Sequence, residues 1–168
     1  MNYWLNIHWP PLQEDKPEPP SPLPDPEYHY RVYLPDGRQN AGEDLKQGDY
    51  VFIYETKTGR ARKGAGKYAP GRQGIIALVR VLTPIMEKPD EQPEEYLDGS
   101  VLWWKWQARS QVRQLGFCSR RDVCSILGYS KDYNFRGYGE ARSGLRKLTK
   151  EQFDSLLEYF RASQYVAQ

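Results

Sequence analysis

The stretch Gln47-Gly48-Asp49-Tyr50-Val51-Phe52-Ile53-Tyr54-Glu55-Thr56-Lys57 decides how the rest of the chain is arranged. Gly48 suits a left-handed turn, Asp49 can bond its own backbone, and β-branched and aromatic residues then alternate, which predicts a tight turn followed by a strand. Val51 and Ile53 face one side of that strand, and the aromatic residues face the other. Apolar bulk on both sides indicates a strand that is covered on both faces or curls into a small barrel.

Other stretches also have the composition of strands, and they lie at residues 2–9, 27–34, 74–83 and 101–108. The run from Gly74 to Thr83 is almost continuously apolar, which indicates burial on both faces. Residues 39–47 can hold one helical turn, whereas the acidic, proline-containing residues 84–98 predict a loop.

The C-terminal third of the chain predicts two helices. Ser119 can cap the first, and Gly128 ends it. Thr149 and Gln152 form a capping box for the second, and an aromatic, glycine-rich irregular segment fills residues 129–148. The whole pattern predicts a single α+β domain over residues 1–168, a small curved β-barrel or sheet flanked by short α-helices.

A proline-rich segment follows the first strand. Pro10 to Pro26 holds eight of the thirteen prolines, which predicts an extended surface loop. Such a segment can also dock a partner protein, and that alternative stays open.

Cysteine usage and the apolar runs bear on the compartment. Cys118 and Cys124 are the only cysteines and lack Cys-x-x-Cys spacing, so we expect a reducing cytoplasm. Met1-Asn2-Tyr3-Trp4 does not begin a signal peptide, and the apolar run at residues 75–82 is too short to cross a membrane. We therefore expect a cytoplasmic monomer with no membrane contact.

The charges are unevenly distributed although the net charge is only +2. Residues 56–80 and 99–121 contain no Asp or Glu, while acids gather at residues 87–98. Two basic blocks separated by an acidic loop suggest a polarised surface that meets polyanions; the alternative is a solvated face whose counter-charges come from elsewhere in the fold. We expect phosphate contacts from Lys57, Arg60, Arg62, Lys63, Lys67, Arg72 and Arg109.

Most signatures of catalysis and metal binding are missing from the sequence. Its two histidines, His8 and His29, cannot supply a His-rich metal site, and neither zinc spacing nor a deaminase signature is present. Gly59 to Gly64 has the first spacing of a phosphate loop, but Ala65 stands in the position of the lysine. We therefore expect no metal, no cofactor and no catalytic residues.

Nucleic-acid binding has more support. The cationic loops can neutralise phosphates, and the chain has five tryptophans and thirteen tyrosines. Rings that could stack on a base are Trp9, Tyr54, Trp104 and Trp106, and side chains that could read a base edge are Asn6, His8 and Asn40.

Three segments resemble an EVE domain, a member of the PUA-like group related to YTH domains. They are Asn2-Tyr3-Trp4-Leu5-Asn6-Ile7-His8-Trp9, Lys46 to Lys57 with its Gly-Asp turn, and Gly74-Ile75-Ile76-Ala77-Leu78-Val79-Arg80-Val81. The resemblance implies a PUA-like curved sheet or barrel and a pocket for a modified, flipped nucleobase of DNA or RNA. It also implies an association with restriction or RNA-modification systems.

Carried onto this chain, the resemblance places the pocket at Trp4, His8, Trp9, Tyr54, Glu55, Trp104 and Trp106. Many family members carry Trp-x-x-Val-Arg-Asn before the Gly-Asp turn. This chain departs from that pattern and has Arg38-Gln39-Asn40-Ala41, in which Asn40 is the candidate counterpart, so the recognised base stays open.

Two other functions remain as alternatives. The PUA-like group also resembles ASCH domains, some of which are hydrolases or ribonucleases, and Lys57 beside Thr56 and Glu55 could serve such chemistry. The second alternative is an interaction module that docks a partner through Pro17 to Pro26.

Overall fold

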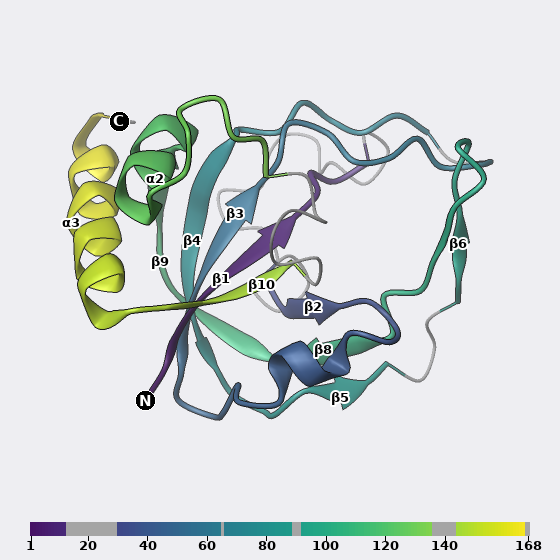
Figure 1. Cartoon of the computed structure of the whole chain (residues 1–168), viewed down its shortest axis with the longest axis horizontal. Coiled ribbons are helices and arrows are strands. Elements are labelled where there is room, and N and C mark those ends of the chain that lie inside the picture. The colour runs from purple at the N-terminus through teal and green to yellow at the C-terminus, as the bar shows by residue number, and fades with distance from the viewer. Residues whose placement is uncertain (13–29, 65, 89–91, 136–143, 167–168) are drawn as a thin grey trace.

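A computed structural model describes residues 1–12, 30–64, 66–88, 92–135 and 144–166. Its largest element is a five-stranded sheet in the order β10–β1–β3–β4–β9 (Figure 1). The strands span Leu145–Leu148 (β10), Tyr3–His8 (β1), Tyr50–Glu55 (β3), Gly74–Val81 (β4) and Ser110–Ser119 (β9). β1 and β3 are parallel, and the other neighbouring pairs are antiparallel.

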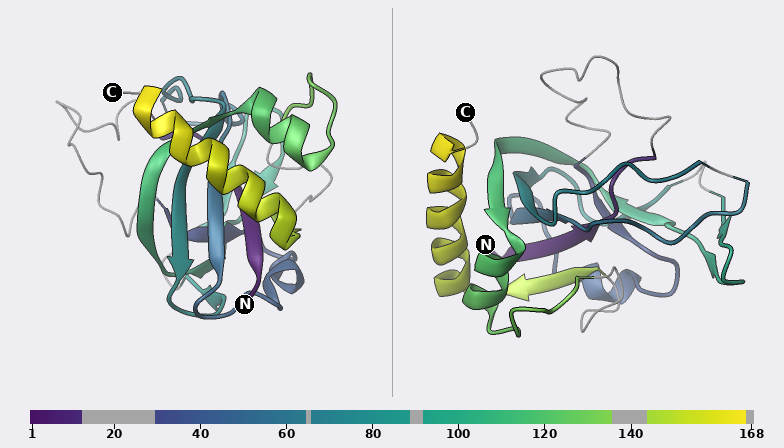
Figure 2. Two further views of the ribbon diagram at one scale, coloured as in Figure 1. Left: turned by 90° about the vertical axis from the view of Figure 1, so that its left-hand side faces the viewer. Right: turned by 90° about the horizontal axis from the view of Figure 1, so that it is seen from above.

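Two α-helices cover one face of this sheet. They are α2, Arg120–Leu127, and α3, Lys150–Val166, which crosses the strands obliquely (Figure 2). Phe52 of β3 faces them, with its ring centroid 5.2 Å from that of Phe153 and 5.7 Å from that of Phe160. Both aromatic contacts lie in the interior, so this face is a closed apolar core.

A smaller three-stranded sheet covers the other face. Its order is β2–β8–β5, and the strands span Val32–Leu34 (β2), Trp106–Ala108 (β8) and Met86–Glu87 (β5). A 3₁₀ helix, η2, occupies Gln39–Gly42 beside β2. Val51 and Ile53 of β3 pack here, so β3 is buried on both faces, as its apolar composition predicts.

A hairpin forms the third and smallest β unit. It pairs β6, Glu94–Glu95, with β7, Val101–Leu102. In Figure 1, β6 lies at the side of the molecule opposite α3.

The turn before β3 is confirmed. Gly48 has φ = +92°, in the left-handed region that favours glycine. Asp49 is only 3% exposed, and its carboxylate accepts hydrogen bonds from the Asn2 and Lys46 amides and the Trp4 indole, each at 3.0 Å. This carboxylate therefore joins the turn to the start of β1.

The sheet stays open rather than closing into a barrel. β10 and β9 are its two edges, and no pairing joins them in the part of the chain that the structure describes. Of the two expected forms, the curved sheet holds and the closed barrel is wrong.

Several predicted boundaries also need correction. The ten-residue strand β9 was not predicted, and β10 lies inside the segment expected to be irregular. Residues 101–108 do not form one strand, because β7 and β8 belong to different sheets. The expected loop at residues 84–98 contains β5 and β6.

Both helix starts are confirmed. The Ser119 hydroxyl accepts a hydrogen bond from the Asp122 amide at 3.2 Å, and Gly128 follows α2 with φ = +77°. At α3 the Gln152 amide donates to the Thr149 hydroxyl at 3.1 Å, and the Thr149 amide donates to the Gln152 side chain at 3.0 Å. This reciprocal pair is a capping box.

Neither α2 nor α3 combines the length and apolar character needed to cross a lipid bilayer, a finding limited to the described residues. Most of the predicted proline-rich loop, from residue 13 onward, lies outside the described residues, as do residues 27–29 of the weak strand prediction.

Candidate functional site

Asn6 lies at the centre of the polar contacts near the carboxyl end of β1. Its side chain is fully buried. The amide nitrogen donates to the carbonyls of Gly144 at 2.7 Å and Tyr33 at 3.3 Å, and the amide oxygen accepts from the Tyr33 amide at 3.2 Å. Asn6 therefore joins β1 to the start of β10 and to β2.

These contacts also determine how His8 is protonated. The Asn6 oxygen lies 2.7 Å from His8 Nε2. Because the Tyr33 amide already identifies this Asn6 atom as an acceptor, His8 Nε2 must donate and therefore carries a proton. The His8 ring also contacts the Tyr33 ring, with 5.4 Å between their centroids.

Glu55 ends β3 directly beside His8, its register partner in the parallel pair. Its carboxylate accepts a hydrogen bond from the Arg72 amide at 2.9 Å, and the Arg72 Nε lies 4.0 Å away. Burial raises the pKa of Tyr30, and Arg72, which hydrogen-bonds to that phenol, partly opposes the shift. Glu55 thus lies beside His8 in the sheet, is held by the Arg72 amide and acts electrostatically on Tyr30.

Gly71 permits this close approach. A Cβ atom at Gly71 would lie 1.7 Å from the Thr56 carbonyl oxygen, so a side chain does not fit there. Thr56 in turn donates its amide proton to the His8 carbonyl at 2.9 Å, which ties the ends of β1 and β3 together.

Trp9 is the centre of an aromatic cluster just past β1. Its ring makes edge contacts with three others, with centroid distances of 6.0 Å to Tyr68, 5.6 Å to Tyr96 and 5.5 Å to Trp104. The Tyr96 hydroxyl donates to Glu94 at 2.6 Å. Burial raises the pKa of Tyr68 to about 12 and, together with Glu94, also raises that of Tyr96.

Two lysine amines lie over half-buried rings of the smaller sheet and of the segment that leads into β8. Lys88 Nζ is 4.9 Å from the Tyr33 ring centroid. Lys105 Nζ is 4.4 Å from the Trp103 ring and 5.5 Å from the Trp106 ring. The indole nitrogens of Trp103 and Trp106 are buried and have no hydrogen-bond partner. We use the name ring site for six partly buried rings, which are His8, Trp9, Tyr33, Trp103, Trp104 and Trp106. Within this set His8 contacts Tyr33, Trp9 contacts Trp104, and Lys105 lies over both Trp103 and Trp106.

Two of the predicted pocket residues lie elsewhere. Tyr54 is 1% exposed and packs in the helix-side core, with its ring centroid 4.4 Å from that of Phe135. Trp4 is 4% exposed, and its indole nitrogen is bonded to Asp49. Each of these two rings fills a core, and Trp106 of the ring site packs against the core that contains Trp4.

The remaining predicted pocket residues divide between the site and its surroundings. His8, Trp9, Trp104 and Trp106 belong to the ring site, and Glu55 adjoins it through His8. Asn40 is exposed on η2. Tyr33, Trp103, Lys88 and Lys105 were not predicted. The alternation of strand residues places a ring on a face but cannot tell which distant segment meets it.

Three of the cations predicted to contact phosphates form ion pairs with acidic residues of the same protein. Arg60, Arg62 and Lys63 each pair with an acid of residues 94–98: Arg60 with Asp98 at 4.0 Å, Arg62 with Glu94 at 2.9 Å and Lys63 with Glu95 at 3.5 Å. The basic loop and the acidic segment therefore lie side by side. This agrees with the alternative interpretation, in which acids from elsewhere in the fold neutralise the basic block. Lys57, Lys67, Arg72 and Arg109 are exposed on the surface.

No group of three or more metal-ligating side chains occurs within the described ranges. Cys118 and Cys124 are free and buried, and burial raises the pKa of Cys118 to about 12. A thiol with so high a pKa is a poor nucleophile at neutral pH.

Fold and site together define an α+β protein with an open mixed sheet, helices on one face and an aromatic, lysine-flanked site on the other. No protein-family model matches the chain, and no curated protein matches it either.

Two solved structures are similar to it over nearly their whole length. Rpa0253 from Rhodopseudomonas palustris is 10% identical with a TM-score of 0.50, and the match covers 96% of this chain and 94% of that one. Protein Atu2648 from Agrobacterium tumefaciens is 18% identical with a TM-score of 0.48, covering 97% and 93%. At such low identity, the likeness to Rpa0253 concerns the fold alone.

Proposed function

We propose that this protein binds a nucleic-acid strand and accepts one modified base, extruded from its stack, against the rings of the ring site. The observation that carries this proposal is the placement of Lys88 and Lys105 over half-buried rings of Tyr33, Trp103 and Trp106. Ring faces beside cations combine stacking on a base with attraction to its phosphates.

The degree of burial separates the ring site from the cores. Tyr54 and Phe52 are 1% and 0% exposed and belong to a closed interior. Trp9, Trp103, Trp104 and Trp106 are only partly buried although they are among the largest apolar side chains of the protein. Partly covered rings, two of which (Trp9 and Trp104) contact each other, offer a surface on which a planar base can stack.

The free energy gained by stacking a base on these rings is comparable to the free energy needed to extrude it. Extruding a base costs a few kcal/mol, and stacking on an aromatic side chain returns about 1–3 kcal/mol per ring. A methyl group on the base adds roughly 0.8 kcal/mol if it becomes buried. Two or three ring contacts are therefore enough to hold an extruded base, and one buried methyl group gives several-fold selectivity.

The buried indole nitrogens of Trp103 and Trp106 also support a polar ligand. A buried donor without a partner costs about 1–3 kcal/mol. An acceptor atom on a bound base that reached either indole would remove this cost. A PUA-like fold, which the resemblance to EVE domains implies, is part of the same proposal.

The paired cations do not exclude phosphate binding. Lys63 and Glu95 side chains are 69% and 64% exposed, and an exposed pair is worth only about 0–1 kcal/mol. A phosphate can therefore compete for Lys63, while Lys57 and Lys67 are exposed without an ion pair to any described residue.

The test is binding of fluorescent single strands, DNA and RNA, that are identical except for one position. That position carries a plain base, an adenine methylated on its exocyclic nitrogen, or a methylated or hydroxymethylated cytosine. We expect preference for one modified base, and Trp104→Ala should weaken that complex about tenfold, since one stack is lost.

Trp104→Phe is the matched control, because it keeps a stacking ring and loses the same indole. It should retain most of the affinity. Equal binding of all strands, or unchanged binding by Trp104→Ala with its melting temperature preserved, would contradict the proposal. Turnover of a nucleic acid or nucleoside that Lys57→Ala abolishes would favour the ASCH-like enzyme instead.

A further inference from the structure

The hairpin of β6 and β7 carries an exposed apolar tip next to the aromatic cluster. Leu97 at the tip is 71% exposed and Val101 is 59% exposed. Both values exceed those of the other exposed large apolar side chains except Met1, at 73%. The two residues flank one turn, because Val101 pairs with Glu95 across the hairpin.

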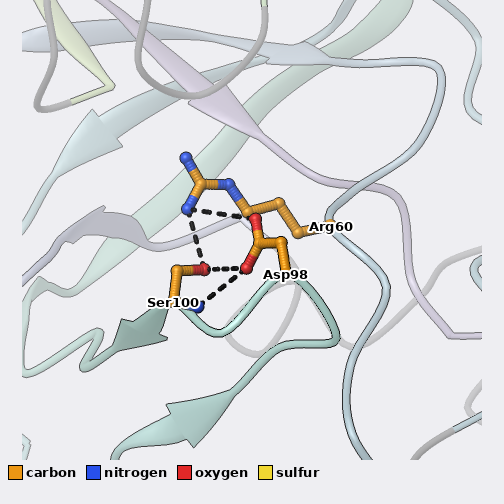
Figure 3. Close-up of polar contacts among 3 residues, drawn as sticks. All are labelled: Arg60, Asp98 and Ser100. Carbon is orange, nitrogen blue, oxygen red and sulfur yellow. Dashed lines mark hydrogen bonds and ion pairs between the residues drawn. The ribbon is translucent and has the colours of Figure 1, made fainter.

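The tip is held rigidly. Gly99 has φ = +83°, and its amide donates to the Tyr96 carbonyl at 3.0 Å. The Asp98 carboxylate accepts from both the amide and the hydroxyl of Ser100, and Arg60 reaches that hydroxyl at 3.0 Å (Figure 3). The hydrogen bonds from Ser100 also lower the pKa of Asp98.

A second segment stiffens the hairpin along its length. The Leu97 amide donates to the Ala61 carbonyl at 2.9 Å, and the Lys63 amide donates to the Glu95 carbonyl at 2.9 Å. The hairpin is therefore tied by its backbone to residues 60–63, and the side chains of Arg60 and Lys63 flank it.

The hairpin is also built into the ring site. The Tyr96 ring is 2% exposed and contacts Trp9. β7 leads directly into Trp103 and Trp104, and the four residue-to-residue steps from Ser100 to Trp104 span at most about 14 Å. A rigid apolar tip thus lies a short distance along the chain from the rings proposed to hold the base.

We propose that the hairpin is a wedge, and that Leu97 enters the base stack of a duplex at the position that the extruded nucleotide leaves. Apolar side chains inserted between base steps are a known way to unstack a duplex. The exposed patch of Leu97 and Val101 is too small for a stable protein interface, which buries roughly 800 Å² on each partner. The three acids of the hairpin each have a basic partner, so the approach to phosphates is not opposed by unpaired carboxylates.

This inference rests on the proposed function, and one set of measurements separates the two. The probe is the DNA strand with one adenine methylated on its exocyclic nitrogen, used alone and annealed to its complement, together with the matching methylated-cytosine pair of probes. Leu97→Ala should weaken binding to the duplex at least about fivefold and leave single-strand binding unchanged. Leu97→Phe should keep duplex binding, and Leu82→Ala, at a leucine that is 38% exposed, should change neither.

The other possible results distinguish failure of the wedge from failure of the proposed function. Equal losses on duplex and single strand would make Leu97 part of the base site, and no loss on either would overturn the wedge. A protein that binds the single strands but never the duplexes would also overturn the wedge and leave the proposed function standing. Binding to neither would end both, and a dimer that Leu97→Ala dissociates would assign the tip to self-association.

Discussion

Asn6 shows how one buried amide can hold the residues around a candidate site in place. Its oxygen and nitrogen are both used, toward Tyr33, Gly144 and His8. A same-sized apolar residue would leave the Tyr33 amide and the Gly144 carbonyl without these partners in the interior. The orientation of His8 and the position of β2 therefore depend on this side chain.

Removing this amide should cost stability first. Asn6→Ala should lower the free energy of unfolding by about 3 kcal/mol, because two buried backbone groups lose their partner. Asn6→Asp keeps the size but cannot donate to Gly144, so it should also destabilise the protein. Urea unfolding followed by tryptophan fluorescence measures both. Asn134→Ala, at an exposed asparagine, is the control, and a loss below about 1 kcal/mol for both Asn6 variants would contradict the assignment.

At the scale of single elements, the start of α3 depends on the capping box. Thr149→Ala removes the acceptor of the Gln152 amide and should cost about 1 kcal/mol. Thr149→Ser keeps a hydroxyl and should retain most of that stability. Thr149 is exposed, so the change has little packing component. Thermal melting is the measurement, and equal melting temperatures for the two variants would show that the hydroxyl contributes nothing.

Caps and turns could be predicted from the sequence because they are local. The caps at Ser119 and Thr149 and the glycine turn at Gly48 behave as predicted, since each depends on residues within a few positions along the chain. The bonds from Asn2 and Trp4 to Asp49 are long-range and were not predicted. The strand β9 could not be predicted in this way. Its register against β4 shifts at two places, so its side chains do not keep one alternation along its ten residues.

The site could be predicted only in part, for the same reason. The sequence points to His8, Trp9 and Trp104 by residue type, but Tyr54 has the same type and fills a core. Alternation assigns Tyr54 to one face of β3 and does not show that α2 and α3 cover that face. Which rings stay partly exposed is decided by segments far apart in sequence.

At the scale of the whole molecule, the sequence also does not show which charged segments the fold brings together. The basic loop of residues 56–64 and the acidic residues 94–98 are separate blocks in sequence, yet the fold joins them through three ion pairs and two backbone hydrogen bonds. The surface there is consequently less polarised than the sequence suggests. Binding of a polyanion at this loop must exchange existing pairs, which predicts a smaller salt dependence than the number of cations alone would give.

Stability of the whole molecule at high pH should depend on its buried phenols. Burial raises the pKa of Tyr68 from 10.0 to about 12 and also raises those of Tyr30, Tyr54 and Tyr96. The unfolded chain then loses these protons at lower pH than the folded protein does. The stability from each phenol is complete below pH 10 and declines as the pH rises toward the folded-state value.

Tyr68→Phe tests this directly. Between pH 10 and 12, the range set by the raised pKa of Tyr68, the variant should lose stability less steeply than the wild type, by up to about 1.4 kcal/mol per pH unit. At neutral pH this effect is absent, because the phenol is protonated in both states, so urea unfolding at neutral pH supplies the reference. Parallel stability curves for the two proteins across the alkaline range would mean that Tyr68 titrates equally in the folded and unfolded chains.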